Sequence, residues 1–430
     1  MAVRKIKLAA LLAALILLCL AAASVLRPQA PKRDLRAEPL RIAVASDLHY
    51  LSKDLTDNGP FFRAVVEKGD GKLMLDVEAI TEAFVGQMID EAPDLLILCG
   101  DLSFNGAYQS HADLAEKLRR IEASGIPVLV IPGNHDLLNS SAARFEGEGF
   151  ERVRGTTPED FAELYASFGP DEALAFDENS VSYAVEPCRG LRIILLDTNS
   201  AAANTLPKES LSWLEKQLKE ARRSGARVIT VSHQNLLTHN GRFTYGYVIN
   251  NAGEIGSLLT RYGVMANLSG HMHIQHFLRD GFPELLTSAL SVSPCRYGLL
   301  TYEGDALRYE ARSVDVSAWA QKQGLTDEKK LDFAAYARDS FYAHFARQIL
   351  EDASLQELPA EDLERLARCF AETNLAYFAG GELDRRWLAD EITFWEETAG
   401  EDFHTSYLRS ILTDEAPSST ECVLWEKERG

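Results

Sequence analysis

Cysteine is scarce in this sequence, and no two cysteines lie close enough to form a CxxC pair. The six cysteines are Cys19, Cys99, Cys188, Cys295, Cys369 and Cys422. Zinc knuckles and redox-active dithiols usually show such a pair, so neither kind of site is expected. An oxidising compartment would permit a Cys188–Cys295 or a Cys369–Cys422 disulfide. Nothing in the spacing requires one, and we expect free thiols.

Positive charge is also limited. The chain has 44 lysines and arginines against 64 aspartates and glutamates, a formal net charge of -20 at pH 7. A strongly acidic surface repels the phosphate backbone of DNA and RNA, which argues against routine nucleic-acid binding. A small phosphate ester remains a suitable partner, because a cationic metal centre would attract it.

The length and composition indicate a folded protein with more than one part. A chain of 430 residues exceeds the usual size of a single hydrophobic core. With 46% hydrophobic and 25% charged residues, extensive disorder is not expected. We predict a signal peptide or membrane anchor over residues 1–27, a linker over 28–39, a main domain over 40–315 and a helical C-terminal domain over 316–430.

The N-terminal segment has the pattern of an export signal. Three basic residues precede an uncharged, mostly apolar stretch over residues 8–26. At about 1.5 Å rise per residue, such a helix would span roughly 28 Å of membrane. The alanines at 21–23, just before Ser24, offer a cleavage site, so the segment is either a removed signal peptide or a retained anchor. Either reading places the folded body outside the cytoplasm, in the extracellular space or attached to the cell membrane.

Beyond the linker, short apolar runs alternate with segments of helical periodicity. This rhythm predicts parallel strands joined by helices, with functional groups at the carboxyl ends of the strands. The expected strands cover 41–46, 94–99, 127–131, 182–185, 192–196, 227–232, 264–269, 298–302 and 306–312, and the expected helices cover 76–91, 111–124, 158–168 and 207–224.

The last quarter of the chain differs in character. From residue 316 onward it contains 12 basic and 24 acidic residues, and its periodicity predicts helices over 327–353, 359–377 and 383–398. Trp319, Trp387 and Trp395 are expected to anchor a small helical core. Two interpretations remain open: the region is a packed cap, or it shapes a substrate pocket.

Five short segments, each at or just after an apolar run, contain half of the ten histidines. They are Asp47-Leu48-His49, Gly100-Asp101, Gly133-Asn134-His135-Asp136, His233 and Gly270-His271-Met272-His273. On an extended backbone, residues i and i+2 project to the same side, so each DxH or HxH pair is expected to converge. A pair of divalent cations needs a bridging carboxylate and a mixed shell of nitrogen and oxygen ligands. These segments supply such a shell.

The order DxH, GD, GNHD, His and GHxH resembles the pattern of the calcineurin-like metallophosphoesterase family. The resemblance covers about half of the chain, from Asp47 to His273. It implies an α/β fold in which a two-sheet β-sandwich is flanked by helices in α-β-β-α layers. It also implies two divalent metal ions, for which mixed ligands suit manganese, iron or zinc without selecting one. The implied ligands are Asp47, His49 and His273 for the first ion, Asp101 for both, and Asn134, His233 and His271 for the second.

The resemblance further implies a phosphoester hydrolase in which a metal-bridging hydroxide attacks phosphorus. His135 would assist the leaving oxygen, and Asp136 would orient His135. The substrate would be a phosphodiester or a phosphomonoester, including nucleotides and cyclic nucleotides. A nuclease of the same fold and a non-catalytic surface scaffold stabilised by its metals are the alternatives. A purely structural site would not require His135, and this counts against the scaffold.

Other residues near these segments are weaker candidates. His239 and His276 each lie within six residues of an implied ligand and could touch substrate. His111, His344 and His404 are expected to be packing or surface residues. Arginines and tyrosines that flank the motifs could grip a phosphate or stack on a base, although most are expected to be solvated. They are Arg144, Arg152, Arg154, Arg242, Tyr245 and Tyr247.

Overall fold

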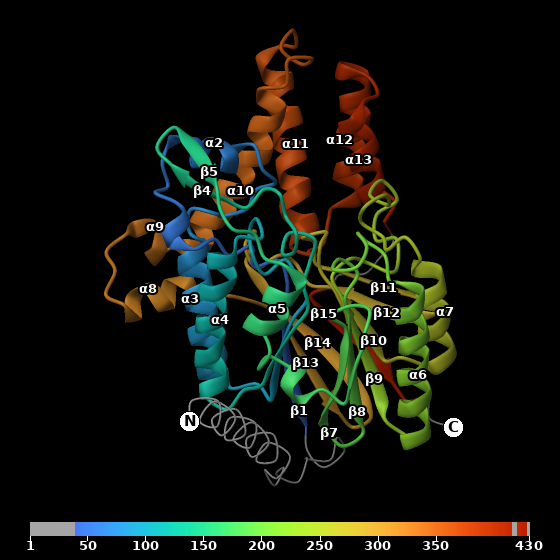
Figure 1. The fold of residues 1–430 in the computed structure, drawn as a ribbon. Helices are drawn as coiled ribbons and strands as arrows, with labels where there is room; N and C mark the ends of the chain where they lie inside the picture. The colour runs from blue at the N-terminus through green and yellow to red at the C-terminus, as the bar shows by residue number, and fades with distance from the viewer. Residues whose placement is uncertain (1–38, 415–418, 428–430) are drawn as a thin grey trace, which may run out of the picture.

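The computed structural model describes residues 39–414 and 419–427 (Figure 1). The predicted signal peptide or anchor lies outside the described residues, as does the linker up to residue 38. Within the described part of the chain, no helix has both the length and the hydrophobicity needed to span a bilayer. No disulfide joins the five described cysteines, which are those from Cys99 onward.

Two mixed β-sheets pack face to face at the centre of the molecule. The first has the strand order β15-β14-β13-β1-β2-β3, in which β1, β2 and β3 run parallel and the other neighbours run antiparallel. Its strands are β1 (Leu40–Ala45), β2 (Leu95–Leu98), β3 (Val128–Val130), β13 (Arg296–Glu303), β14 (Ala306–Ser313) and β15 (Glu421–Glu426).

The second sheet has the strand order β11-β12-β10-β9-β8-β7-β6. Its central strands β8, β9, β10 and β12 are parallel. The bounds are β6 (Ala175–Phe176), β7 (Tyr183–Cys188), β8 (Leu191–Leu196), β9 (Arg227–Ser232), β10 (Ala266–Ser269), β11 (His276–Asp280) and β12 (Phe282–Leu286).

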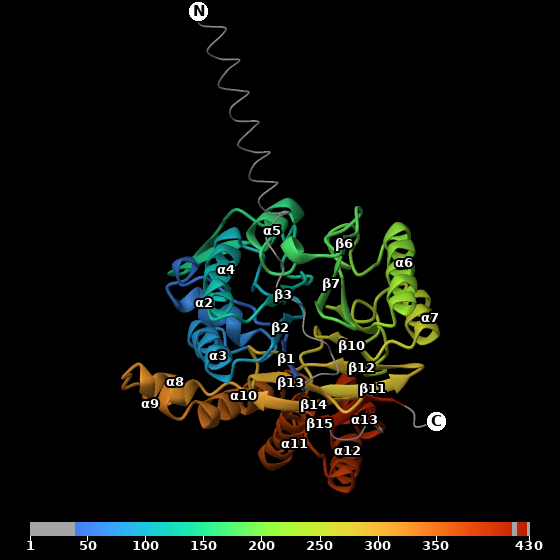
Figure 2. The ribbon, with the colours of Figure 1, turned by 90° about the horizontal axis from the view of Figure 1, so that it is seen from below.

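Alternate side chains along a strand pack into two different hydrophobic cores. In β1, Ile42 and Val44 belong to the core between the sheets, whereas Ala43 and Ala45 belong to the core beneath the helices α3 (Val77–Glu91) and α4 (Tyr108–Ala123). Helices α6 (Lys208–Ser224) and α7 (Ala252–Tyr262) cover the outer face of the second sheet. Figure 2 shows these α-β-β-α layers from one end. They confirm the predicted fold.

Some elements in the connections between strands were not predicted. Helix α2 (Pro60–Glu67) lies in the connection after β1, and the hairpin β4 (Ala143–Glu146) and β5 (Gly149–Arg152) lies in the excursion that precedes α5 (Pro158–Leu164). Single 3-10 turns occur at Lys53–Leu55 and Pro170–Glu172. These segments contain too few residues to show a hydrophobic periodicity.

The C-terminal region is helical, as expected. Its helices are α8 (Val316–Lys322), α9 (Glu328–Leu331), α10 (Phe333–Leu350), α11 (Ala360–Phe378), α12 (Arg385–Ala399) and α13 (Phe403–Leu412). Trp395 is fully buried in their core, and Trp319 and Trp387 are partly buried against hydrophobic clusters. After these helices the chain returns to the first sheet, where β15 pairs antiparallel with β14. This strand was not predicted, and it ties the end of the chain to the central sandwich.

Candidate metal centre

The five sequence segments meet at one edge of the sandwich. Each follows a parallel strand: Asp47 follows β1, Asp101 follows β2, Asn134 follows β3, His233 follows β9, and His271 and His273 follow β10. The carboxyl ends of parallel strands lie at the same edge of a sheet. Helices α11, α12 and α13 stand above this edge in Figure 1.

The backbone at these segments is left-handed rather than extended. Five of the seven implied ligands have positive φ angles, which are 53° at Asp47, 46° at His49, 47° at Asp101, 67° at His271 and 60° at His273. Such conformations are costly for non-glycine residues and gather at functional sites. The extended geometry expected for the pairs is therefore wrong. Asp47 and His49 do converge, but the side chains of His271 and His273 lie in two different groups of candidate ligands.

The first group consists of Asp47, His49 and His273. The Nε2 atom of His273 lies 3.3 Å from Oδ1 of Asp47 and 3.1 Å from Nε2 of His49. Oδ1 of Asp47 is buried without a hydrogen-bond donor among the described residues. Burial acts to raise the pKa of Asp47, but His273 and the nearby His233 outweigh it and hold that pKa below its usual value. A buried carboxylate that stays ionised beside two imidazoles fits a cation.

The second group consists of Asp101, His233, His271 and Asn134. Nε2 of His233 lies 3.3 Å from Oδ2 of Asp101 and 3.0 Å from Oδ1 of Asn134. The same Oδ2 atom of Asp101 lies 3.9 Å from Nε2 of His49 in the first group. One buried carboxylate oxygen thus faces both groups, which is the position that a bridging ligand requires.

Backbone carbonyls fix two of these imidazoles in a defined tautomer. Nδ1 of His233 donates to the carbonyl of Cys99 at 2.9 Å, and Nε2 of His271 donates to the carbonyl of Gly246 at 3.0 Å. A carbonyl only accepts, so the bonded nitrogen carries the proton. When the ring is neutral, the other nitrogen, Nε2 of His233 or Nδ1 of His271, presents its lone pair to the cluster. Such outer hydrogen bonds are typical of metal-binding histidines.

Asp70 is the corresponding outer partner of the His273 ring, and this role was not predicted. Its Oδ2 lies 3.1 Å from Nδ1 of His273 and 2.7 Å from Nζ of Lys72. Burial acts to raise the pKa of Asp70, but Lys72 and His273 hold it well below its usual value. Asp70 lies in the loop between α2 and α3, where no apolar run or histidine marks it in the sequence. An isolated loop aspartate carries no signal of this role.

The imidazoles respond strongly to the surrounding carboxylates. Burial disfavours a charged ring at His233, but Asp101 beside it raises the pKa of His233 to about 9. Burial and Lys72 also disfavour a charged ring at His273, yet Asp70 and Asp47 raise the pKa of His273 to about 9. Burial and the neighbouring His233 lower the pKa of His271 to about 4. The carboxylates therefore favour positive charge at His233 and His273, whereas burial disfavours it at His271.

Two motif glycines are explained by close approach. A Cβ atom at Gly133 would clash with Asp101, and one at Gly270 would clash with Ser46 and Asp47. The neighbouring loops pack directly against the carboxylates at these points. The GN and GH pairs of the motif therefore require glycine for space.

His135 lies beside the cluster with one nitrogen held by the backbone. Its Nδ1 donates to the carbonyl of Phe104 at 2.8 Å, and its Nε2 lies 3.9 Å from Oδ2 of Asp101. The side chain is 35% exposed. Nε2 therefore faces both the centre and solvent, where a substrate would enter.

The expectation that Asp136 orients His135 is wrong. The Asp136 carboxylate is buried and accepts hydrogen bonds from Leu102 N, Ser103 N, Ser103 Oγ and Gly133 N. These bonds join the loop after β2 to the loop after β3. Asp136 therefore holds the two ligand-bearing loops together, and the carbonyl of Phe104 orients the His135 ring.

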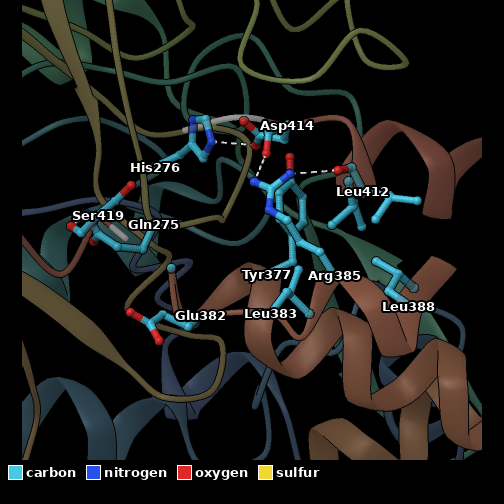
Figure 3. Close-up of a pocket in the computed structure, with 13 residues that line it drawn as sticks. Gln275, His276, Tyr377, Glu382, Leu383, Arg385, Leu388, Leu412, Asp414 and Ser419 are labelled. Carbon is cyan, nitrogen blue, oxygen red and sulfur yellow. Dashed lines mark hydrogen bonds and ion pairs between the residues drawn. The ribbon is translucent and has the colours of Figure 1, made fainter. Parts of the chain in front are cut away.

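His239 and His276 belong to a different network. Their Nδ1 atoms lie 2.8 Å apart, Nε2 of His239 lies 3.3 Å from Glu284, and Nε2 of His276 lies 2.6 Å from Asp414. Figure 3 shows His276 and Asp414 at a cavity of about 380 Å³ that Arg385 also lines. The network joins the edge of the second sheet to the C-terminal helices, so a role against substrate at the metal centre is not supported.

Of the flanking arginines and tyrosines, Tyr247 lies against an implied ligand, with its ring centroid 5.1 Å from that of His271. Tyr245 is 95% exposed. The arginines are engaged elsewhere: Arg144 with Asp54 O, Arg152 over Phe150, Arg154 over Tyr108 and Arg242 over Phe403. The predicted packing role of His111 is confirmed, because its buried ring contacts Tyr165 and Asp136.

Comparison with known families agrees with this geometry. Residues 40–275 match the profile of the calcineurin-like phosphoesterases. The chain belongs to this family. It is a hydrolase of phosphoric esters with candidate groups for divalent metals. Residues 315–417 match a second profile, the C-terminal domain of cyclic nucleotide phosphodiesterase.

Individual relatives are distant. The chain is 26% identical over 240 residues to a probable glycerophosphodiester phosphodiesterase GpdQ of Arcobacter nitrofigilis, covering 54% of this chain and 76% of the relative. It is 26% identical over 201 residues to a probable cyclic nucleotide phosphodiesterase of Fibrobacter succinogenes, covering 47% of this chain and 64% of the relative. A dimetal phosphatase from Danio rerio aligns with 64% of this chain and 97% of its own, at 14% identity and a TM-score of 0.45.

Proposed function

We propose that the chain is a phosphodiesterase that uses two divalent cations bridged by Asp101. The observation that carries the proposal is the position of Asp101 Oδ2, which faces His233 at 3.3 Å and His49 at 3.9 Å. Both relatives are named as probable phosphodiesterases, which supports a diester as the substrate. The residues that would hold the ions are Asp47, His49, His273, Asp101, Asn134, His233 and His271.

Two bound cations would supply Lewis acidity toward a phosphoryl oxygen and would lower the pKa of a water molecule shared between them. The donor set contains imidazole nitrogens, carboxylate oxygens and one amide oxygen, which suits manganese, iron or zinc. The protein contributes a buried, preorganised arrangement of these donors. Carbonyls and carboxylates behind the histidines keep the rings oriented.

His135 would donate a proton to the leaving oxygen. Because Phe104 O accepts from Nδ1, the Nε2 atom is the one that can meet substrate. As an imidazolium, Nε2 would transfer its proton to the ester oxygen while the bond between phosphorus and that oxygen breaks. Water supplies the oxygen that bonds to phosphorus in this exchange, so the products are an alcohol and a phosphomonoester.

The substrate class is tested with bis(p-nitrophenyl) phosphate and p-nitrophenyl phosphate, each with manganese, zinc or iron present. The proposal expects turnover of the diester, loss of turnover with a chelator, and recovery on addition of metal. Preference for the monoester would replace diesterase by monoesterase activity. Inactivity on both esters, and on nucleotides and cyclic nucleotides, would overturn the proposed function.

We also propose that the protein is exported and that residues 316–430 act as a C-terminal domain on the enzyme domain. The basic residues before the apolar stretch over residues 8–26 support export. N-terminal sequencing of the protein recovered from its native host tests this: a start near Ser24 indicates a cleaved signal peptide, and an intact N-terminus in the membrane fraction indicates an anchor. An intact N-terminus in the cytoplasm would contradict export.

A further inference from the structure

A cavity lies between the C-terminal helices and the candidate metal centre. Its volume is about 270 Å³, and the implied ligands His271 and His273 form part of its wall. Known ligand pockets span roughly 300–1,000 Å³, so the cavity has room for one small group. Because the wall includes residues implied to hold the cations, a group bound there would be attached to a phosphate at the centre.

Aromatic rings enclose one side of the cavity in an unbroken chain of contacts. The chain starts at His271, whose ring centroid lies 5.1 Å from that of Tyr247. Tyr247 lies 5.2 Å from Phe243, Phe243 lies 5.7 Å from Tyr407, and Tyr407 lies 5.9 Å from Phe370. Tyr247 and Phe243 come from the loop after β9, and Tyr407 and Phe370 come from α13 and α11. Two distant parts of the chain therefore build one wall.

The contacts on the other side of the cavity lead back to the metal centre. The Phe370 ring lies 5.8 Å from that of Phe345 on α10. The Phe345 ring packs against Gly71, where an added Cβ would lie 3.4 Å from it. The neighbouring Asp70 contacts Nδ1 of His273 at 3.1 Å. The contacts around the cavity therefore begin at His271 and end at His273.

The lining carries little net charge. Among the described residues that line the cavity there is no lysine or arginine, and Asp70 is the one carboxylate. Asp70 is already paired with Lys72 and with His273. A second anionic group on the ester would find no lysine or arginine among these lining residues, and the nearby guanidinium of Arg242 lies over the outer ring of Phe403. Rings presented at tilted and edge-to-face angles suit another ring, which can add offset and edge contacts.

We propose that this cavity binds the organic group of the ester, and that this group is an uncharged planar aromatic ring. The inference rests on the proposed function and deepens it by naming a substrate class. Phe243 and Phe403 would be specificity-determining residues, one from each part of the chain. Phe403 lines the cavity and is 51% exposed, so it lies at the solvent side.

The test measures binding of phosphonates to the full chain saturated with manganese, by calorimetry. Benzylphosphonate, butylphosphonate and methylphosphonate share one head group and are not hydrolysed at the carbon–phosphorus bond. We expect benzylphosphonate to bind roughly tenfold more tightly than methylphosphonate, because the ring buries more apolar surface. Phe243→Ala and Phe403→Ala should each reduce this ratio to about threefold or less. Phe403→Ala removes a half-exposed ring and provides the test should Phe243→Ala fail to fold.

Tyr245→Ala is the matched control, since Tyr245 lies in the same loop as Phe243 but is 95% exposed. Its binding ratio should equal that of the wild type. Equal affinities for the three phosphonates, or ratios unchanged in both phenylalanine variants, would overturn the proposal while leaving phosphodiesterase activity intact. Tighter binding of 2-(trimethylammonio)ethylphosphonate than of benzylphosphonate would also overturn it, in favour of a cationic group. Failure of every phosphonate to bind, together with absence of turnover, would overturn the proposed function as well.

Discussion

Oδ2 of Asp70 lies 3.1 Å from Nδ1 of His273, while Nε2 of the same ring lies 3.3 Å from Asp47. The two nitrogens of one imidazole are thus divided between an outer carboxylate and the candidate metal centre. An outer carboxylate fixes the tautomer of a metal-binding histidine and makes its free nitrogen a better donor.

Asp70→Ala should therefore weaken metal binding by about 10- to 100-fold, the usual effect of losing such a partner. Competition with a chelating dye measures this directly. Asp90→Ala is the matched control, because the Asp90 side chain is 67% exposed and pairs only with Lys322 among the described contacts. Equal metal affinity of Asp70→Ala and the wild type would show that the Asp70 contact has no function at the centre.

His135→Ala should retain both ions but lose turnover. The ring touches substrate through Nε2 in this account, so its loss removes proton transfer, which contributes about 10²- to 10⁴-fold to such reactions. The measurement is kcat on bis(p-nitrophenyl) phosphate, combined with metal analysis of the same sample. A variant with normal turnover, or one that has lost its metal, would contradict the assigned role.

Gly270→Ala should disturb the centre by a steric clash alone. The added methyl group would clash with Ser46 and Asp47, so the loop after β10 must move and displace His271 and His273. Gly253→Ala is the control, because a Cβ at this helical position meets no atom within 4 Å. We expect metal content to fall in Gly270→Ala and to stay normal in Gly253→Ala. Full metal content in Gly270→Ala would show that the loop tolerates the shift.

The buried histidine network predicts a pH dependence of stability. Burial lowers the pKa of His239, although Glu284 beside it acts in the opposite direction. The folded protein therefore keeps this ring neutral, whereas the unfolded chain binds a proton below about pH 6.5. The stability linked to His239 is fully present above that pH and is lost as the pH falls below it, by at most about 1.4 kcal/mol per pH unit.

His239→Gln should therefore lose less stability than the wild type between pH 7 and pH 5.5. Urea unfolding of both proteins, saturated with manganese, gives the two free-energy curves. Saturation with metal makes the contribution of the centre the same for both proteins. Parallel pH curves would mean that the proton uptake of His239 is equal in the folded and unfolded states.

The sequence predicts much of this molecule because the relevant signals are local. Short apolar runs such as the one ending at Leu98 mark strands, and the polar residues that follow them must gather at the carboxyl edge. The structure brings together all seven implied ligands, and their metal-binding roles remain predictions. The motif glycines follow the same logic, since loops that converge on one carboxylate leave no room for a Cβ.

What the sequence did not predict depends on contacts that leave no local trace. The carbonyl of Phe104 orients His135, and any residue type would offer a carbonyl there. Asp70 reaches His273 across 203 positions of sequence, from a loop without periodicity. The aromatic cavity joins Phe243 to Tyr407 on α13, and the period of a helix does not reveal which loop it will face. The left-handed backbone at the ligands falls on aspartates and histidines, which adopt this conformation more readily than most residues, but no local pattern in the sequence predicts it.

The central claim is that Asp101 joins two cations in one site. Equilibrium dialysis against manganese, followed by metal analysis, tests it in the wild type and in Asp101→Asn. The account predicts about two manganese ions per chain in the wild type and a loss of at least one in the variant. Saturation of the wild type at a single ion, or retention of two equally tight ions by Asp101→Asn, would contradict it.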